Sequence, residues 1–312
     1  MAYNQPVSDG TSLDASTRFC AVFGHPIRHS ASPAMQNAGL AALKLNWRYL
    51  AFDVHPDELR PAIEGAKTMG FIGLNLTVPH KLLALEMVDV VDERAKAWGA
   101  VNTIVFESRG AGGAWTPLAQ AADADATEVR SRGFNTDADA IIQSLQEDFQ
   151  WPHLRGASVL LLGAGGAAKA TALRLAEEGI GRLFLINRTE ERARQLAAEI
   201  RGRFPAVDAQ SGEYPGDPVD LVINATSLGL KKGDALPIDL KWLQSSRPAR
   251  VYDMIYRPME TEFLRAAKTA GCRTANGLGM LLYQGAAALK LWSGMTPPVK
   301  IMRAALEHNI YV

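Results

Sequence analysis

The sequence predicts an α/β protein with two domains, one of them built on a doubly wound parallel sheet. Its 312 residues are enough for two domains of ordinary size. Short apolar runs alternate with amphipathic stretches, the pattern of strands alternating with helices in a parallel sheet. In the second half, a glycine-rich turn joins one apolar run directly to an Ala-rich helical stretch. These three observations set the fold class, and the individual elements follow from them.

Composition and charge exclude several classes of protein. Lys and Arg number 33, as do Asp and Glu, so the chain lacks the basic surplus typical of a nucleic-acid binder. No apolar run reaches the roughly 18 residues that cross a membrane. Residues 1–18 lack the apolar core of a secretory signal, so we interpret them as a polar extension of a cytoplasmic protein. The six histidines show no metal-ligand spacing, and two cysteines make no disulfide framework, so we expect a buried thiol at Cys20.

The first half of the chain is expected to alternate strands with helices. Ser32 is expected to cap a helix whose first residue is Pro33, and Pro56 opens the next helix. Residues 107–132 are rich in Ala, Gly and Asp, and we interpret them as a surface insertion without firm structure. The remaining predictions are strands at 19–23, 47–54, 71–76 and 101–106 and a helix at 81–88.

The second half begins with an amphipathic helix after Asp137 and continues as a regular series. Expected strands are 158–162, 182–187, 220–224 and 250–253, and expected helices are 167–178, 189–200, 278–292 and 298–308. The last two helices follow the glycine-turn unit, so we expect them to pack back on the first domain. The predicted domains are therefore 1–135 with 278–312, and 136–277.

The glycine-rich turn has the spacing G-x-G-x-x-A. It follows a strand-like run and opens a helix, which is the context that gives this weak motif meaning. Glycines let the backbone approach a pyrophosphate, and the helix N-terminus supplies N–H groups and a favourable dipole. The alternative is a turn that only packs a helix on a strand. Its residues are Gly163, Ala164, Gly165, Gly166, Ala167 and Ala168.

The next expected strand ends in Asn187, Arg188 and Thr189. A site for NAD usually carries an acidic residue here, which binds the ribose 2′-hydroxyl. Arg188 instead offers a guanidinium to a 2′-phosphate, so the sequence favours NADP, and Arg192 and Arg194 could add positive charge. The alternative is a solvated basic start of a helix.

Four further polar clusters lie where strands are expected to end, and each has a simpler explanation on its own. The two hydroxyls of Ser30 and Ser32 could bind a carboxylate or serve an ordinary turn and cap. The other clusters place a lysine at a helix start, an amide in an apolar run and a carboxylate at a helix N-terminus. They contain Asn75, Thr77 and Lys81, then Asn102, and then Asn135 and Asp137.

Taken in this order, the clusters resemble the shikimate dehydrogenase family over about residues 19–310. Each motif is weak alone, and the ordered set is a specific signal. The matching segments are Ser30-Ala31-Ser32-Pro33, Asn75-x-Thr77-Val78-Pro79-x-Lys81, Ala100-Val101-Asn102-Thr103, Asn135-Thr136-Asp137, Gly163–Ala168, Asn187-Arg188-Thr189, Asn224-Ala225-Thr226-Ser227, Asp253-Met254-x-Tyr256-x-Pro258 and Gly277-x-Gly279-Met280-Leu281-x-x-Gln284.

The resemblance implies a role for each matching position. Lys81 would exchange the proton at the alcohol or ketone oxygen, Asp137 would pair with it, and Ser30 and Ser32 would hold a substrate carboxylate. Asn75 and Asn135 would fix loops. Ring hydroxyls would meet Thr77, Asn102, Tyr256 and Gln284. The pyrophosphate would lie on Gly163–Ala168, the 2′-phosphate on Asn187, Arg188 and Thr189, and the nicotinamide beside Thr226, Met254 and Gly277.

The implied activity is the NADPH-dependent reduction of 3-dehydroshikimate to shikimate, a step toward aromatic amino acids. The substrate is thus a small molecule, no metal is needed, and a homodimer is possible. One alternative is a quinate/shikimate dehydrogenase, because Gln36 stands where the family usually has His. A second is a non-catalytic nucleotide-binding regulator, although such a protein is expected to lose Lys81 or Asp137. The 107–132 segment exceeds the hairpin expected there.

Overall fold

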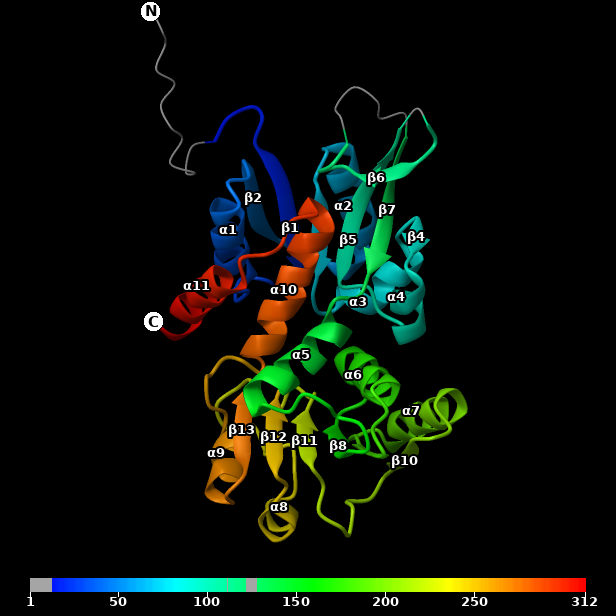
Figure 1. Cartoon of the computed structure of the whole chain (residues 1–312), viewed down its shortest axis with the longest axis vertical. Coiled ribbons are helices and arrows are strands. Elements are labelled where there is room, and N and C mark those ends of the chain that lie inside the picture. Colours follow the sequence, from blue (N-terminus) through cyan, green and yellow to red (C-terminus); the bar gives the residue numbers. More distant parts are fainter. Residues whose placement is uncertain (1–12, 111, 122–127) are drawn as a thin grey trace, which may run out of the picture.

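The computed structural model describes residues 13–110, 112–121 and 128–312. These residues form a 7-stranded sheet and a 6-stranded sheet. The sheets lie toward opposite ends of the molecule in Figure 1, with helices α5 (Asp137–Phe149) and α10 (Leu278–Ser293) near their junction. None of the helices in the described ranges is long and apolar enough to cross a membrane.

The 7-stranded sheet is mixed and comes from the first half of the chain. Strand β1 (Arg18–Gly24) lies between β2 (Trp47–Asp53) and β3 (Gly73–Leu76), parallel to both. Strand β5 (Thr103–Arg109) is antiparallel to β3 and to β7 (Glu128–Phe134). The remaining elements of this half are β4 (Val90–Val91), β6 (Trp115–Pro117), α1 (Ser32–Ala42), η1 (Pro56–Glu58), α2 (Leu59–Thr68), α3 (His80–Leu83), η2 (Ala84–Glu86) and α4 (Glu93–Trp98).

The prediction of a structureless insertion at 107–132 is wrong. The segment's ends belong to β5 and β7, and β6 pairs with β5. Glu107 is buried and stays satisfied because Arg130 reaches its carboxylate at 2.7 Å across the strand pair. Charged residues such as Glu107 and Arg130 interrupt the apolar pattern by which a strand is predicted from sequence, so these strands were missed. Residues 111 and 122–127 of this prediction lie outside the described residues.

Three smaller predictions for this half are also corrected. Ser32 is the first residue of α1, because Ala31 occupies the N-cap position with a helical backbone and no side chain caps the helix. The helix expected at 81–88 is split between α3 and η2. The expected extension of residues 1–18 ends early, since Thr17 is buried and donates to Asn46 Oδ1 at 3.0 Å; residues 1–12 lie outside the described ranges.

The 6-stranded sheet is parallel throughout, as predicted, with the order β10-β9-β8-β11-β12-β13. The order reverses between β8 and β11, which is where ligands bind in open α/β sheets. The strands are β8 (Ser158–Leu162), β9 (Arg182–Ile186), β10 (Asp208–Ser211), β11 (Leu221–Asn224), β12 (Arg250–Asp253) and β13 (Arg273–Asn276). The helices are α6 (Gly166–Glu177), α7 (Glu190–Arg203), α8 (Leu240–Ser246) and α9 (Glu262–Thr269).

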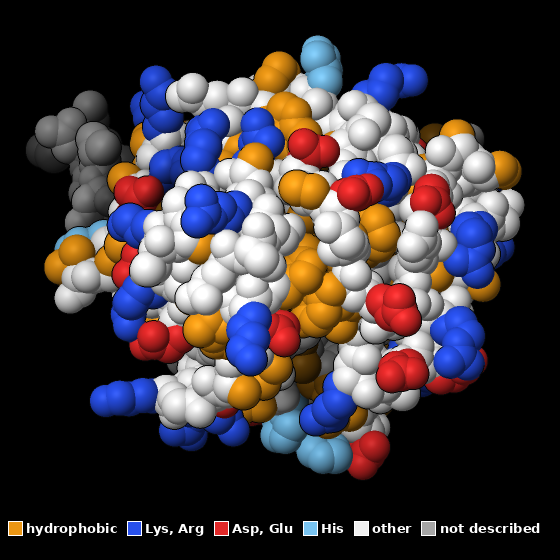
Figure 2. Space-filling model, turned by 90° about the horizontal axis from the view of Figure 1, so that it is seen from below, with side chains coloured by type: hydrophobic (Ala, Val, Ile, Leu, Met, Phe, Trp, Pro, Cys, Tyr) orange, Lys and Arg blue, Asp and Glu red, His pale blue; other side chains and the backbone are white. Residues whose placement is uncertain are grey.

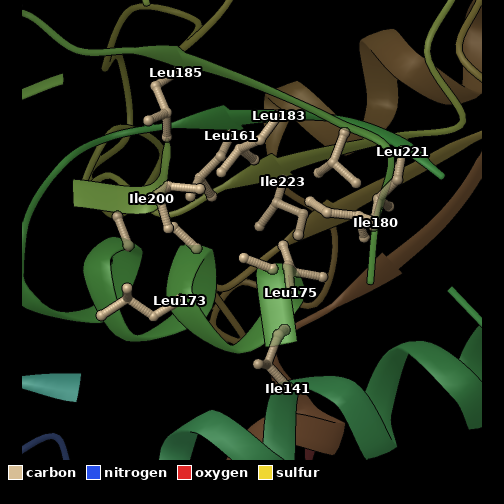
Figure 3. Packing of buried hydrophobic residues seen from close by; sticks show 14 of the residues in the cluster. Ile141, Leu161, Leu173, Leu175, Ile180, Leu183, Leu185, Ile200, Leu221 and Ile223 are labelled. Atoms are coloured by element: carbon tan, nitrogen blue, oxygen red, sulfur yellow. The ribbon is translucent and has the colours of Figure 1, made fainter. Parts of the chain in front are cut away.

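The core of this half lies between the sheet and its helices. Leu161 and Ile223 of the central strands share one buried cluster with Leu173 and Leu175 of α6, and all four are fully buried (Figure 3). Ile141 of α5 joins the same cluster. Helix α5 is therefore packed rigidly against the second sheet, and this fixes the side chain at its N-terminus.

The last two helices pack back on the first half, which confirms that expectation. Helix α11 (Val299–Tyr311) lies along α1. Trp292 at the end of α10 is fully buried, and its indole N–H donates to the Ile104 carbonyl at 3.0 Å. A Cβ at Gly73 would lie 2.1 Å from that indole nitrogen, so only glycine leaves space for the tryptophan. The boundaries at 135/136 and 277/278 stay predictions.

Candidate active site

Two connected hollows lie between the halves. A smaller one of about 180 Å³, here called the inner cavity, is lined by Ser30, Ser32, Asn75, Thr77, Lys81, Asp137, Met254, Tyr256, Gly277 and Gln284, among others. A larger one of about 1050 Å³, here called the outer cleft, is lined on the side of the second sheet by Ala167, Thr226 and Met254. His29, Thr77, Met254 and Tyr256 line both. The inner cavity thus draws most of the predicted substrate residues together.

Lys81 and Asp137 meet in the inner cavity although 56 residues separate them. Lys81 Nζ donates to Asp137 Oδ2 at 2.7 Å, a charge-assisted hydrogen bond. The lysine side chain is 26 % exposed and the aspartate 8 %, so the ammonium remains open to a ligand while the carboxylate is largely shielded. A cation held in this way can donate a proton to an oxygen placed beside it.

The position of Asp137 follows from how α5 begins. Asn135 Oδ1 accepts hydrogen bonds from the backbone N–H groups of Asp137 and Ala138, at 3.0 and 3.1 Å. Asn135 Nδ2 donates to the Ala100 carbonyl at 3.0 Å. The side chain of Asp137 is therefore free for Lys81, and the alternative that it merely caps the helix does not hold.

Asn102 occupies a different place from the one the resemblance implies. It is 1 % exposed and does not line the inner cavity. Its Oδ1 accepts from Thr136 N at 2.7 Å, and its Nδ2 donates to Thr136 Oγ1 at 3.0 Å. Asn102 thus secures the turn that leads to Asp137. Asn75 has a similar bracing role, accepting from Tyr49 and donating to Thr103, and it also lines the cavity.

Gln36 lies outside both hollows. It is 1 % exposed, and its Nε2 donates to the Gly285 carbonyl of α10 at 2.9 Å. Gln36 therefore joins α1 to α10, and it lines neither the inner cavity nor the outer cleft.

The glycine-rich turn lies at the carboxyl end of β8. Gly163 has φ +109°, and a Cβ there would lie 3.0 Å from the Ala225 carbonyl, so glycine is required. Asn187 Oδ1 accepts from Ala164 N at 3.1 Å and joins the turn to the end of β9. Gly165 at the N-cap of α6 carries no capping side chain, which leaves the first N–H groups of the helix available to an anion.

Positive charge is available beside this turn. Arg188 is exposed, and its guanidinium makes no hydrogen bond or ion pair with any residue in the described part of the chain. Thr189 is exposed next to it. Arg194, which was expected to add charge, is paired with Glu191 at 2.7 Å. On the face shown in Figure 2, cationic and anionic side chains are interspersed.

Asn224 and Asp253 organise the loops that follow β11 and β12, and neither residue was predicted to have a role of its own. Asp253 is fully buried and accepts from Asn224 Nδ2, Ile255 N and Thr261 Oγ1 at 2.9, 3.1 and 2.7 Å. Burial is the main cause that raises the pKa of Asp253 to about 6. Asn224 Oδ1 accepts from Thr226, so the pair shapes both loops. The sequence signal that could have identified Asn224 and Asp253 is that each is a polar residue at the end of an apolar strand, β11 or β12.

Gly277 closes the same side of the inner cavity. A Cβ there would lie 2.0 Å from the Met254 carbonyl, which explains a glycine between β13 and α10. Among the described residues no group of three or more His, Cys, Asp and Glu side chains is arranged to hold a metal ion. The site therefore offers a lysine–carboxylate pair, two hydroxyls and an anion-binding turn.

Known proteins share this arrangement over nearly the whole chain. Residues 22–104 match the shikimate dehydrogenase substrate binding domain, 144–229 the shikimate / quinate 5-dehydrogenase family, and 277–307 the shikimate 5′-dehydrogenase C-terminal domain. A shikimate dehydrogenase (NADP(+)) of Moorella thermoacetica is 43 % identical, with 95 % of this chain and 94 % of the relative covered. This chain belongs to the shikimate dehydrogenase family.

Further shikimate dehydrogenases agree in sequence and in fold. The NADP(+) enzyme of Methanopyrus kandleri is 39 % identical, with 97 % of this chain and 99 % of the relative covered. A shikimate dehydrogenase crystallised in complex with NADP+ superposes with a TM-score of 0.83 at 34 % identity, covering 97 % of this chain and 99 % of its own. The two-domain α/β fold predicted from sequence is therefore confirmed.

Proposed function

We propose that this chain catalyses the reversible NADPH-dependent reduction of 3-dehydroshikimate to shikimate. The observation that carries the proposal is the Lys81–Asp137 hydrogen bond of 2.7 Å, in a cavity that also contains two serine hydroxyls and adjoins the outer cleft. Membership of the shikimate dehydrogenase family supports the same reaction. Lys81 and Asp137 are both present, which argues against a non-catalytic regulator.

The residues at the glycine turn fit a phosphorylated dinucleotide. Gly163 brings the backbone close to Ala225, and the uncapped start of α6 presents N–H groups to a pyrophosphate. The exposed guanidinium of Arg188 suits a 2′-phosphate. When bound, NADPH supplies the hydride. The residues proposed to hold it are Gly163, Ala164, Gly165, Gly166, Ala167, Ala168, Asn187, Arg188 and Thr189, with Thr226, Met254 and Gly277 beside the nicotinamide.

Lys81 is the proposed proton donor in the reduction and proton acceptor in the reverse direction. Reducing a ketone places a hydride on carbon and a proton on oxygen, so a donor must lie beside that oxygen. The Lys81 ammonium faces the inner cavity and also stabilises the negative charge that develops on the oxygen. Asp137 holds the ammonium in place and, from the same cavity, binds the substrate hydroxyl region.

The remaining wall of the inner cavity is proposed to select the substrate. Ser30 and Ser32 bind the carboxylate through hydroxyl donors, and Thr77, Tyr256 and Gln284 bind ring hydroxyls. Asn102 acts indirectly, through its hydrogen bonds to Thr136 next to Asp137. We assign residues 1–135 with 278–312 to substrate binding and 136–277 to cofactor binding. A cytoplasmic homodimer remains a prediction, and light scattering in solution tests its oligomeric part.

Initial rates with shikimate and quinate, each with NADP and with NAD, test the proposal. We expect the highest kcat/KM with shikimate and NADP, because Arg188 stands where an NAD site carries an acidic residue. Comparable rates with quinate would assign the chain to the quinate/shikimate dehydrogenases instead. No turnover in any of the four reactions would refute a dehydrogenase of this class.

A further inference from the structure

The last turn of α11 reaches the wall of the inner cavity. The Tyr311 hydroxyl, one residue from the C-terminus, donates to the Tyr256 backbone carbonyl at 3.1 Å and accepts from Asn276 Nδ2 at 2.9 Å. Arg257 Nη2 donates to the Asn309 carbonyl of the same turn at 3.0 Å. Two successive residues of the loop after β12 are therefore bound to the end of the chain.

Asn276 extends this contact to two other segments of the site. Its Nδ2 also donates to the Met259 carbonyl at 2.8 Å, at the far end of the loop that carries Tyr256. Its Oδ1 accepts from Leu278 N at 3.1 Å, at the start of α10, which carries Gln284. Asn276 precedes Gly277, the glycine that closes the cavity. Tyr311 thus forms a hydrogen bond with Asn276, the residue that joins the loop of Tyr256, Gly277 and the start of α10.

The rest of α11 is anchored to the helix that begins with Ser32. Met302 and Leu306 of α11 are fully buried in the same cluster as Met35 and Leu40 of α1. Because protein interiors are close-packed and barely compressible, a helix buried in this way holds its neighbours at fixed distances. Helix α11 therefore connects α1, which begins with Ser32, to the loop of Tyr256, across the two halves of the chain.

We propose that Tyr311 is a positioning residue for substrate binding, which fixes Tyr256 at a set distance from Ser30 and Ser32. This inference rests on the proposed function. Tyr256 lines the inner cavity, and its hydroxyl has no hydrogen-bond partner among the described residues, so it is available to a substrate hydroxyl. Its backbone is held by Tyr311, and a shift of that backbone moves the hydroxyl.

Tyr311→Phe tests the proposal, because it keeps the ring and removes both hydrogen bonds. We expect the KM for shikimate to rise about fivefold, since two hydrogen bonds of modest net strength are lost. The KM for NADP should stay at its wild-type value, and any fall in the melting temperature should be small, as expected for the loss of two hydrogen bonds. Tyr214→Phe is the matched control: its hydroxyl accepts from Asp239 N at 2.9 Å, Tyr214 lines neither hollow, and the KM of this variant for shikimate should not change.

A double-variant cycle with Tyr256→Phe shows whether Tyr311 acts by positioning the Tyr256 hydroxyl or by stabilising the fold in general. In the Tyr256→Phe background, Tyr311→Phe should no longer change the KM for shikimate, because the hydroxyl that it positions is absent. An unchanged KM in the single variant, an equal rise in both backgrounds, or a parallel rise in both KM values with a lower melting temperature would overturn the inference. Wild-type chain that fails to oxidise shikimate would instead refute the proposed function.

Discussion

The side chain of Lys81 should dominate the chemical step. Lys81→Ala is expected to lower kcat by at least about 10²-fold, because the proton donor is lost while the cavity and the glycine turn remain. Lys81→Arg should not restore the rate, since a guanidinium does not release its proton near neutral pH. Steady-state kinetics with shikimate and NADP measure both. A near-normal kcat with a tenfold higher KM would show that Lys81 only binds substrate.

Arg188 should decide between the two dinucleotides. Arg188→Ala is expected to weaken NADP by about 1.5–3 kcal/mol and to leave NAD nearly unchanged, because only NADP carries the phosphate that the guanidinium contacts. KM values for both cofactors measure the difference. Arg194→Ala is the matched control, since Arg194 is already paired with Glu191 and should affect neither cofactor. Equal losses of both cofactors in Arg188→Ala would contradict the assignment.

Individual site residues could be predicted from sequence to different degrees. Lys81 and Asp137 were predicted because the ordered motifs resemble the shikimate dehydrogenase family; each residue alone had a simpler explanation, a solvated charge or a helix cap. Asn102 was not, because its side chain turns to Thr136, and sequence does not indicate which way a buried amide points. Asp253 was visible as a residue, but its role depends on Asn224 and Thr261, which only the fold brings together.

At the scale of helices, the start of α5 should depend on Asn135. Asn135→Ala is expected to lower the free energy of unfolding by about 1–2 kcal/mol, because its oxygen caps two backbone N–H groups. It should also lower kcat, since Asp137 loses its fixed position. Thr189→Ala serves as the control, because Thr189 is exposed at the N-cap of α7 and its side chain makes no capping hydrogen bond, so the stability of this variant should change little. Urea unfolding measures both, and equal losses would contradict this comparison.

Elements with an apolar centre were predictable, whereas short polar ones were not. Strands β8, β9 and β12 lie within one residue of their predicted bounds because each has a run of buried residues at its centre. Strands β10 and β13 read Asp-Ala-Gln-Ser and Arg-Thr-Ala-Asn, and they form at the sheet edges because a neighbouring strand supplies hydrogen bonds. Such strands depend on their neighbours in the fold, and they show no alternation of apolar and polar residues from which they could be predicted.

At the scale of the whole molecule, Asp253 should make stability depend on pH. Its pKa is raised to about 6 in the fold, so the folded state holds a proton that the unfolded state releases above its ordinary value of 3.8. The stability of the wild type relative to Asp253→Asn should therefore fall by about 1–3 kcal/mol as pH rises from 4 to 6.5. Urea unfolding at several pH values measures this difference. A difference that does not vary with pH would mean that Asp253 titrates normally.

The tryptophan of α10 that occupies the space above Gly73 has a consequence for the order of folding during synthesis. Residues 18–134, which form the first sheet, leave the ribosome long before Trp292 does. Until Trp292 emerges, the space above Gly73 is not filled by its ring, and the Ile104 carbonyl lacks the hydrogen bond from its indole N–H. The first sheet therefore cannot finish its core ahead of the second, although N-terminal domains usually fold first. A nascent chain stalled before α10 should remain sensitive to protease around α1 and β2, whose buried residues share a cluster with Trp292.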